Sequence, residues 1–264
     1  MKIGIIGLGN MGSAILGGVV AKGIEQKDNI LGFDVSESFR DRAKTNQGIK
    51  IAASNEELVS EADVVILAVK PQHMGDMLAS IKNKWKKETL IISIAAGKTI
   101  DWLENNIGSD MKIVRCMPNT PALVGEGCTG VCFNKNVKDA DKETALKILT
   151  ACGKAIEVTE AQMDAVVGIS GSSPAYVFMF IEAMADAGVA AGLTRDKAYE
   201  FAASAVKGSA ALMLETGKHP GELKDMVCSP AGTTIAAVQT LEEGGFRGLV
   251  MDAVEACVER NRQL

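Results

Sequence analysis

The stretch Met1-Lys-Ile-Gly-Ile-Ile-Gly-Leu-Gly-Asn-Met-Gly12 decides the fold, because three spaced glycines join a strand pattern to a helix pattern. A short apolar run precedes Gly7, and a helical pattern follows over residues 13–22. Gly7, Gly9 and Gly12 have G-x-G-x-x-G spacing, which permits a tight turn, a close backbone approach to a pyrophosphate and close helix–strand packing. The helix N-terminus then presents free N–H groups to the phosphates. We therefore predict a dinucleotide site here, rather than a structural glycine-rich turn.

Composition sets the class of protein before any further motif is considered. The chain has 264 residues, of which 47% are hydrophobic, and a net charge of −5. This length suits one large domain or two modest ones. The acidic balance argues against nucleic acid or an anionic membrane as a partner. Six cysteines without a C-x-x-C pair and only two histidines argue against a metal site, and reduced cysteines predict a cytoplasmic protein.

Strand and helix signals alternate through residues 1–159, which predicts an α/β fold with a doubly wound parallel sheet of Rossmann-like type. The expected strands are 2–6, 29–34, 63–69, 89–94, 112–116, 128–134 and 155–159. The expected helices between them are 13–22, 36–46, 72–84, one that starts at Thr99, and 139–152. We take residues 1–159 as a dinucleotide-binding domain.

Residues 160–264 carry helix signals only and are predicted to form an all-helical substrate and dimerisation domain. The expected helices are 173–191, 194–215, 232–241 and 245–262. They hold more apolar surface than a helical domain of this size hides alone, which predicts an intertwined homodimer. A compact bundle packed on the sheet domain is the alternative. The apolar stretch 175–192 contains Glu182 and Asp186, so we expect a core or interface helix and not a membrane span.

Asp34 ends the second expected strand, about 20 residues beyond Gly12, where an acidic side chain can accept hydrogen bonds from ribose hydroxyls. A carboxylate there repels a 2′-phosphate and so favours NAD. Ser36 follows at once, with Ser38, Arg40 and Arg42 behind it, and these residues can cradle a 2′-phosphate or form a solvated helix face. The choice between NADH and NADPH stays open.

Three further turns follow expected strands, at the sheet edge where such folds bind ligands. Lys70-Pro71 lies after the third strand in the order above, and Lys70 can face a phosphate or merely seal the turn. Small residues after Ser93 let the backbone approach a ring. Asn119, between two prolines, offers a donor and an acceptor where a nicotinamide is expected.

A last candidate site opens a helix in the second half. Gly232, Thr233 and Thr234 stand in its first turn, where free N–H groups and two hydroxyls suit a carboxylate. The alternative is that these residues only cap the helix.

The motifs together resemble one family. They are G-L-G-N-M-G at 7–12, A-V-K-P-Q at 68–72, R-C-M-P-N-T-P at 115–121, S-G-S-S-P-A-Y at 170–176 and H-P-G-E-L-K-D-M-V-C-S-P-A-G-T-T at 219–234. In this order, over the whole chain, they resemble pyrroline-5-carboxylate reductases. The resemblance implies reduction of the C=N bond of 1-pyrroline-5-carboxylate to L-proline with NADPH or NADH, and a homodimer at minimum, extending to a decamer of dimers.

The resemblance also implies roles for individual residues. The implied cofactor contacts are Gly7, Leu8, Gly9, Asn10, Met11, Gly12, Asn55, Ala68, Val69, Lys70, Pro71, Ile94, Ala95 and Ala96. Gly232, Thr233 and Thr234 correspond to the substrate carboxylate site, with the Thr234 hydroxyl near the ring nitrogen, and Glu160 matches a substrate-side position. The family often has Gly-Gly where this chain has Ala231-Gly232, and Asp34 is less usual for its NADPH-preferring members.

Two other functions compete with this reading. A hydroxyacid dehydrogenase of similar plan needs a general base, usually a lysine where the second domain opens. Residues 168–176 contain no lysine, which counts against alcohol oxidation. A non-catalytic nucleotide sensor has no need of a substrate carboxylate turn like that at 232–234.

Overall fold

The structure, a computed structural model, describes residues 1–263 and contains two compact units. The first comprises Met1–Ser172 and the described residues from Val258 onward, and the second comprises Ser173–Cys257. The domain boundary predicted between residues 159 and 160 is not tested by this division into compact units, and it stays a prediction.

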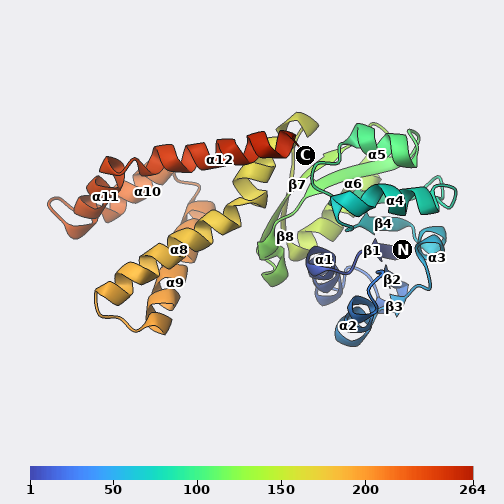
Figure 1. Ribbon diagram of the computed structural model, residues 1–264, viewed down its shortest axis with the longest axis horizontal. Helices are drawn as coiled ribbons and strands as arrows, with labels where there is room; N and C mark the ends of the chain where they lie inside the picture. Colours follow the sequence, from blue (N-terminus) through green and yellow to red (C-terminus); the bar gives the residue numbers. More distant parts are fainter. Residues whose placement is uncertain (264) are drawn as a thin grey trace. The chain divides into compact units, whose positions relative to one another are not determined.

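The first unit is built on one eight-stranded sheet with the strand order β3-β2-β1-β4-β5-β6-β7-β8 (Figure 1). The strands are β1 (Ile3–Ile6), β2 (Ile30–Phe33), β3 (Lys50–Ile51), β4 (Val64–Leu67), β5 (Leu90–Ser93), β6 (Lys112–Met117), β7 (Gly127–Phe133) and β8 (Gly153–Glu157). The strand order reverses beside β1, which pairs with β2 on one side and β4 on the other. In such sheets the ligand crevice lies beyond the carboxyl ends of these central strands.

One strand pair departs from the predicted all-parallel sheet. Six of the seven pairs are parallel, whereas β6 and β7 run antiparallel, with Arg115 opposite Cys132. A parallel return needs a crossover of a dozen or more residues, usually a helix. Only a short 3₁₀ segment, Thr120–Val124, connects these two strands, so β7 returns beside β6 in the opposite direction.

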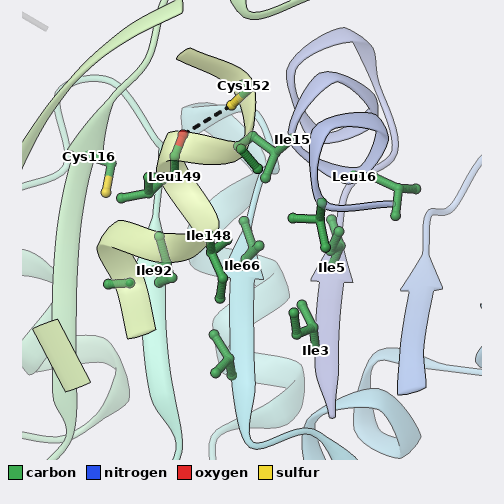
Figure 2. Close-up of a cluster of buried hydrophobic side chains, with 14 of the residues drawn as sticks. Ile3, Ile5, Ile15, Leu16, Ile66, Ile92, Cys116, Ile148, Leu149 and Cys152 are labelled. Carbon is green, nitrogen blue, oxygen red and sulfur yellow. Dashed lines mark hydrogen bonds between the residues drawn. The ribbon is translucent and has the colours of Figure 1, made fainter. Parts of the chain in front are cut away.

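Helices cover both faces of the sheet. They are α1 (Asn10–Ala21), α2 (Glu37–Gln47), α3 (Asn55–Glu61), α4 (Pro71–Ile81), α5 (Ile100–Ile107) and α6 (Asp139–Leu149), followed by the short α7 (Met163–Val166). On one face, α1 and α6 pack their isoleucines and leucines against β1, β4 and β5, as Figure 2 shows for Ile15, Ile148 and Ile66. On the other face, α3, α4 and α5 bury a second cluster that includes Leu58, Leu78 and Leu103. Each fully buried side chain of this size contributes about 1.5–3 kcal/mol.

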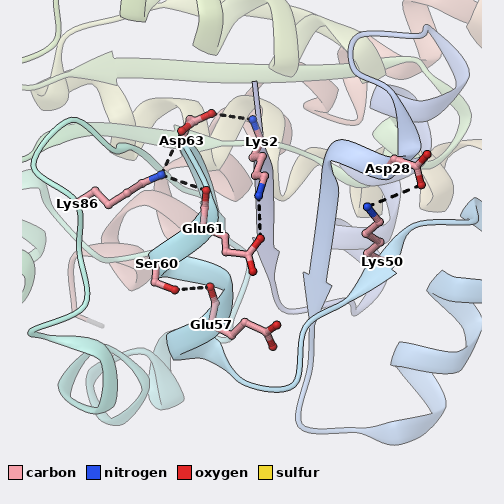
Figure 3. Close-up of polar contacts among 8 residues, drawn as sticks. All are labelled: Lys2, Asp28, Lys50, Glu57, Ser60, Glu61, Asp63 and Lys86. Atoms are coloured by element: carbon pink, nitrogen blue, oxygen red, sulfur yellow. Dashed lines mark hydrogen bonds and ion pairs between the residues drawn. The ribbon is translucent and has the colours of Figure 1, made fainter.

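Polar contacts fix the amino-terminal ends of β1 and β4, at the edge away from the glycine turn (Figure 3). The backbone N–H of Lys2 donates to Asp63 Oδ2 at 2.8 Å, and the Lys2 ammonium pairs with Glu61 at 2.9 Å. The Lys86 ammonium binds Asp63 Oδ1 at 3.1 Å and the Glu61 carbonyl. The Lys2 N–H and then the Lys86 ammonium hold the pKa of Asp63 below its ordinary value. The strand that leads into the glycine turn is therefore held at its start.

The second unit is helical. It contains α8 (Ser173–Ala190), α9 (Arg195–Thr216), α10 (Pro220–Val227), α11 (Thr233–Glu243) and the start of α12 (Phe246–Arg262). Its own buried core is small and consists of Ala185, Ala198 and Ala202, between α8 and α9. Large apolar side chains stay exposed, among them Met179 at 69%, Phe201 at 65% and Met251 at 70%. Such a surface is typical of a protein interface.

Differences from the expected elements are local. Helix α1 begins at Asn10, three residues before the predicted Ser13, so Gly12 lies inside the helix. Four elements, β3, α3, α7 and α10, were not predicted from the sequence. These elements are short, and a short run gives too few turns for a periodic pattern to show.

Candidate functional site

The glycine turn brings the carboxyl ends of β1 and β4 into contact. Gly7 has φ +98, and a Cβ there would lie 2.6 Å from the Ala68 carbonyl oxygen. Glycine is therefore required by conformation and by space. The Gly7 N–H donates to the Phe33 carbonyl at 2.8 Å, which also ties the turn to the end of β2.

Gly9 differs from Gly7, because a Cβ at Gly9 would have no protein atom within 4 Å. The space beside it is open. Gly9 is the N-cap of α1, and no side chain satisfies the N–H groups at that helix start. An uncapped helix N-terminus above an open glycine is a site that accepts a phosphate group. The open space at Gly9 is what a pyrophosphate needs, so these residues fit a dinucleotide.

A cavity of about 570 Å³ opens from this turn along the ends of β2 and β4. It is lined by Ile6, Gly7, Gly9, Phe33, Asp34, Val35, Phe39, Asn55, Ala68, Val69, Lys70, His73, Asp76 and Met77. Seven of these were predicted cofactor contacts. The apolar lining residues carry no distinctive chemistry and were not predicted, and neither were His73 and Asp76 on α4. A mostly apolar wall with few polar groups suits an adenosine.

Asn55 lines this cavity. Its side-chain Oδ1 is buried and has no hydrogen-bond partner within the protein. Asn55 is the first residue of α3, whose N-cap Ser54 accepts the Glu57 N–H at 3.2 Å. Buried polar atoms are almost always paired. This acceptor is therefore an exception, and because it has almost no accessible surface it is not exposed to the cavity.

A second cavity of about 430 Å³ lies on the β5 and β6 side of the glycine turn. It is lined by Gly9, Asn10, Met11, Ala68, Val69, Lys70, Pro71, Ile94, Ala95, Ala96, Met117, Pro118, Asn119, Thr120 and Gly171. Gly9, Ala68, Val69 and Lys70 line both cavities, so the two meet at the end of β4. Residues from the three turns predicted to contact the cofactor, at Lys70–Pro71, Ile94–Ala96 and Asn119, thus line one cavity.

Asn119 is held rigidly in the wall of this second cavity. Its Oδ1 accepts the Cys128 N–H at 2.9 Å, and its Nδ2 donates to Ser170 Oγ at 3.2 Å. Ser170 Oγ in turn donates to the Cys128 carbonyl at 3.0 Å. The predicted acceptor of Asn119 is thus already used within the protein, and one amide N–H remains beyond these bonds.

Asp34 is fixed at the rim of the first cavity by two backbone donors. Its Oδ2 accepts the Leu8 N–H at 2.7 Å, and its Oδ1 accepts the Ser36 N–H at 2.9 Å. The Ser36 hydroxyl pairs with Ser38 Oγ at 2.9 Å.

Three predicted cofactor residues line neither cavity. Leu8 is fully buried, Gly12 packs inside α1 where a Cβ would lie 2.0 Å from the Gly7 carbonyl oxygen, and Ser36 borders Asp34. Their direct contact with a cofactor stays a prediction.

The predicted substrate residues fall in both units. Glu160 belongs to the first, where its carboxylate binds Arg115 on β6. Gly232, Thr233 and Thr234 belong to the second, where Gly232 is the N-cap of α11 and no side chain caps its N–H groups. Ala231 before them has φ +56, a left-handed conformation that is unusual for alanine.

Metal ligands do not gather anywhere in residues 1–263. No group of three or more His, Cys, Asp or Glu side chains there has the geometry to hold an ion.

Comparison with known proteins identifies relatives over the whole chain. Residues 160–264 match the family model described as pyrroline-5-carboxylate reductase dimerisation, and residues 2–97 match that of coenzyme F420-dependent NADP oxidoreductases. The chain is 50% identical over 263 residues to the pyrroline-5-carboxylate reductase of Escherichia coli (strain K12), covering 100% of this chain and 98% of the relative. The enzyme of that name from Methanosarcina acetivorans is 46% identical, with 100% and 97% covered.

Two solved structures are similar to this chain over nearly its whole length. The Plasmodium falciparum pyrroline carboxylate reductase with NADP bound has a TM-score of 0.90 and 39% identity, covering 100% of this chain and 97% of that one. The pyrroline-5-carboxylate reductase of Coxiella burnetii has a TM-score of 0.93 and 36% identity, with 99% and 97% covered.

Proposed function

The chain belongs to the pyrroline-5-carboxylate reductase family, and we propose on this basis that it reduces 1-pyrroline-5-carboxylate to L-proline, the last step of proline biosynthesis, with NADH or NADPH. The observation that carries the proposal is the pair of cavities that meet at the glycine turn. One has the apolar wall expected for an adenosine. The other includes small residues, Ala95, Ala96 and Gly171, that leave room for a flat ring.

The proposed cofactor residues divide by task. The helix N-terminus at Asn10, Met11 and Gly12 orients the pyrophosphate, and the backbone at Ala68–Pro71 and Ile94–Ala96 lies along the two cavities. Bound NAD(P)H supplies the hydride for the reaction. The protein's part is to hold both reactants in a near-attack arrangement, at a separation of about 3–3.5 Å.

The proposed substrate site is the first turn of α11. The uncapped N–H groups after Gly232 suit the single carboxylate of the substrate, and the Thr233 hydroxyl adds a donor. We assign the Thr234 hydroxyl as the hydrogen-bond partner of the imine nitrogen, and Glu160 as a substrate-side residue. Hydride addition to an iminium needs no obligatory protein acid, so a water molecule delivers the proton where one is needed.

The helical residues 160–264 match a dimerisation domain, and the chain forms a dimer or a larger oligomer. We propose the limits 1–159 for the dinucleotide domain and 160–264 for the substrate and dimerisation domain, with a homodimer as the minimum and the decamer of dimers implied by the resemblance as the larger assembly.

One helical stretch, Glu160–Ala190, is long and apolar enough to cross a membrane by length and composition alone. It lies inside the matched dimerisation segment, so we assign its apolar side chains to an interface between copies of the chain. The proposal places the protein in the cytoplasm, with a small imino acid as its partner and neither a membrane nor nucleic acid.

Oxidation of NADH and NADPH, followed at 340 nm with 1-pyrroline-5-carboxylate, tests the reaction directly. We expect turnover with this imine. In the reverse direction, we expect no reduction of NAD⁺ or NADP⁺ by 2-hydroxy acids. Tight cofactor binding without turnover on any ring imine would instead identify a nucleotide sensor.

Thr234→Ala tests the assigned imine contact. We expect kcat/KM to fall about 10–100-fold, equivalent to roughly 1.4–2.7 kcal/mol for a hydrogen bond to a charged partner. Thr234→Ser, which keeps the hydroxyl, restores most of it. Thr240→Ala is the matched control, because Thr240 lies on the same helix and its hydroxyl donates to the Ala236 carbonyl. An unchanged kcat/KM in Thr234→Ala removes Thr234 from the site.

A further inference from the structure

We propose that the adenosine end of the cofactor site selects against a 2′-phosphate, so that the chain binds NADH in preference to NADPH, with Asp34 as the specificity-determining residue. This deepens the proposed function and rests on it for the identity of the cofactor. The preference itself is a property of the first cavity, and it can be measured by binding without any substrate.

Asp34 is a built part of that cavity and not a mobile surface charge. It follows β2 directly, at the position where an acidic side chain of this fold meets the ribose hydroxyls. Its carboxylate is held by the Leu8 N–H and the Ser36 N–H. A carboxylate oxygen can accept more than one hydrogen bond, so both oxygens keep capacity for ribose hydroxyl donors.

A 2′-phosphate brings the wrong chemistry to this position. It carries a charge of nearly −2 at neutral pH and offers only acceptors to a neighbour that also accepts. Two like charges at contact distance repel strongly at the edge of a protein, where the effective dielectric constant is below that of water. A hydroxyl in the same place donates to Asp34 instead.

The two arginines beside this cavity are already engaged by groups of the protein. Arg40 Nη1 donates to the carbonyl of Asp34 at 2.6 Å and to that of Val35 at 3.2 Å. The Arg42 guanidinium lies 4.8 Å from the Phe39 ring centre and donates to the Leu8 carbonyl at 3.2 Å. Neither arginine is among the described residues that line the cavity.

The other polar groups nearby do not restore a phosphate site. The hydroxyls of Ser36 and Ser38 pair with each other at 2.9 Å, which uses one of their two hydrogens, and neither carries a charge that offsets that of Asp34. Lys70 lines both cavities, which places it where they meet and not at the adenosine end alone. His73 lines the first cavity together with Asp76 on the same helix, so a second carboxylate accompanies it.

The experiment measures dissociation constants of NADH and NADPH for the full-length protein without substrate, by nucleotide fluorescence or calorimetry. We expect NADH to bind at least about 10-fold more tightly. AMP and adenosine 2′,5′-bisphosphate, which differ only in the 2′-phosphate, serve as a second pair of probes that isolates the adenosine end, and AMP should bind more tightly.

Asp34→Asn and Asp34→Thr test the residue. Both remove the charge, and we expect each to shift the ratio of the two dissociation constants toward NADPH by about 10-fold or more. Glu37→Gln is the matched control, because it removes one negative charge at the start of α2 outside the cavity. It should leave the ratio unchanged.

Equal or tighter binding of NADPH by the wild type overturns the proposal, and Lys70 then becomes the candidate for the phosphate contact. A ratio that moves equally in Glu37→Gln and the Asp34 variants also overturns it. Where loss of the Leu8 contact unfolds the Asp34 variants, the AMP and adenosine 2′,5′-bisphosphate pair on the wild type still decides. Failure of the proposed function appears differently, as no imine turnover with either nucleotide.

Discussion

Glu160 Oε1 lies 2.8 Å from Arg115 Nη1 and accepts the Ile100 N–H at 2.7 Å, so one carboxylate oxygen joins β6 to the start of α5. The Arg115 side chain is 9% exposed and that of Glu160 is 36% exposed. A buried guanidinium that loses its partner is costly, although water reaches the Glu160 side of the pair. This contact gives Glu160 a structural task alongside its proposed substrate role.

Glu160→Gln should therefore destabilise the protein by about 1–3 kcal/mol. We expect the lower part of that range, because the carboxylate is partly exposed to water. The free energy of unfolding from urea titration at fixed protein concentration measures the loss. Arg115→Met in the Glu160→Gln background should cost less than the sum of the single changes, because the pair is removed together. Additive losses would show that the two side chains are not coupled.

Gly9→Ala should weaken NADH binding about 10-fold or more without lowering stability. The added Cβ meets no protein atom within 4 Å, and the backbone at φ −66 and ψ −166 accepts alanine, so the methyl group only occupies the space assigned to the pyrophosphate. Nucleotide fluorescence gives the dissociation constant and calorimetry gives Tm.

Two neighbouring glycines provide the controls for this prediction. Gly17→Ala lies in the same helix with equally open space and should leave NADH binding unchanged. Gly7→Ala should lower Tm, because its Cβ would lie 2.6 Å from the Ala68 carbonyl oxygen at a φ of +98. Equal losses of NADH affinity in Gly9→Ala and Gly17→Ala would argue against the pyrophosphate position.

Ala231→Gly should raise the free energy of unfolding by about 0.5–1 kcal/mol. Alanine at φ +56 is strained by roughly 1–2 kcal/mol, and the extra freedom of glycine in the unfolded chain takes back part of the gain. The midpoint of urea unfolding should rise with an unchanged slope. Ala236→Gly, inside α11, is the contrasting variant and should lose about 1 kcal/mol. A lower midpoint in Ala231→Gly would refute the strain assigned to this residue.

The fold was predictable because its signals are local and strong. The glycine spacing at 7–12 and the continuous apolar runs at 63–69 and 89–94 mark buried strands and a nucleotide turn without any knowledge of their neighbours. The antiparallel β7 was not predictable from those runs, because a strand's direction depends on the connection and not on its own residues. The strand β3 was missed for a different reason, because its two residues are too few to show a pattern.

Site residues were predictable where a polar side chain stands at a position that this fold uses for a ligand. Asp34 at the end of β2 is such a residue, and the structure places it at the cavity rim. Met77 and Phe39 line the same cavity, but nothing in an apolar residue distinguishes a ligand wall from a core. The contact of Arg115 with Glu160 joins positions far apart in sequence, and the left-handed Ala231 has no sequence signal, since alanine rarely adopts it.

The buried thiols give a prediction with a defined pH window. Burial raises the pKa of Cys132 to about 11, with a smaller contribution from the Glu160 charge that Arg115 opposes, and burial also raises the pKa of Cys116 and Cys152. At pH 8 only about one Cys132 in a thousand is a thiolate, so iodoacetamide should label it far more slowly than in the guanidinium-unfolded chain. Peptide mass spectrometry measures the labelling.

The same pKa shift makes stability depend on pH in one direction. The thiol of Cys132 ionises near pH 8.5 in the unfolded chain and near 11 in the folded one, so its stabilising effect is complete below about pH 8.5 and is lost as pH rises through that interval. The free energy of unfolding should fall by up to about 1.4 kcal/mol per pH unit for this one group. Lysines and tyrosines titrate in the same range, and Cys132→Ala removes only the thiol contribution. The wild type should therefore lose more stability than Cys132→Ala between pH 8.5 and 10.5, and equal losses would mean that the folded thiol ionises as easily as the unfolded one.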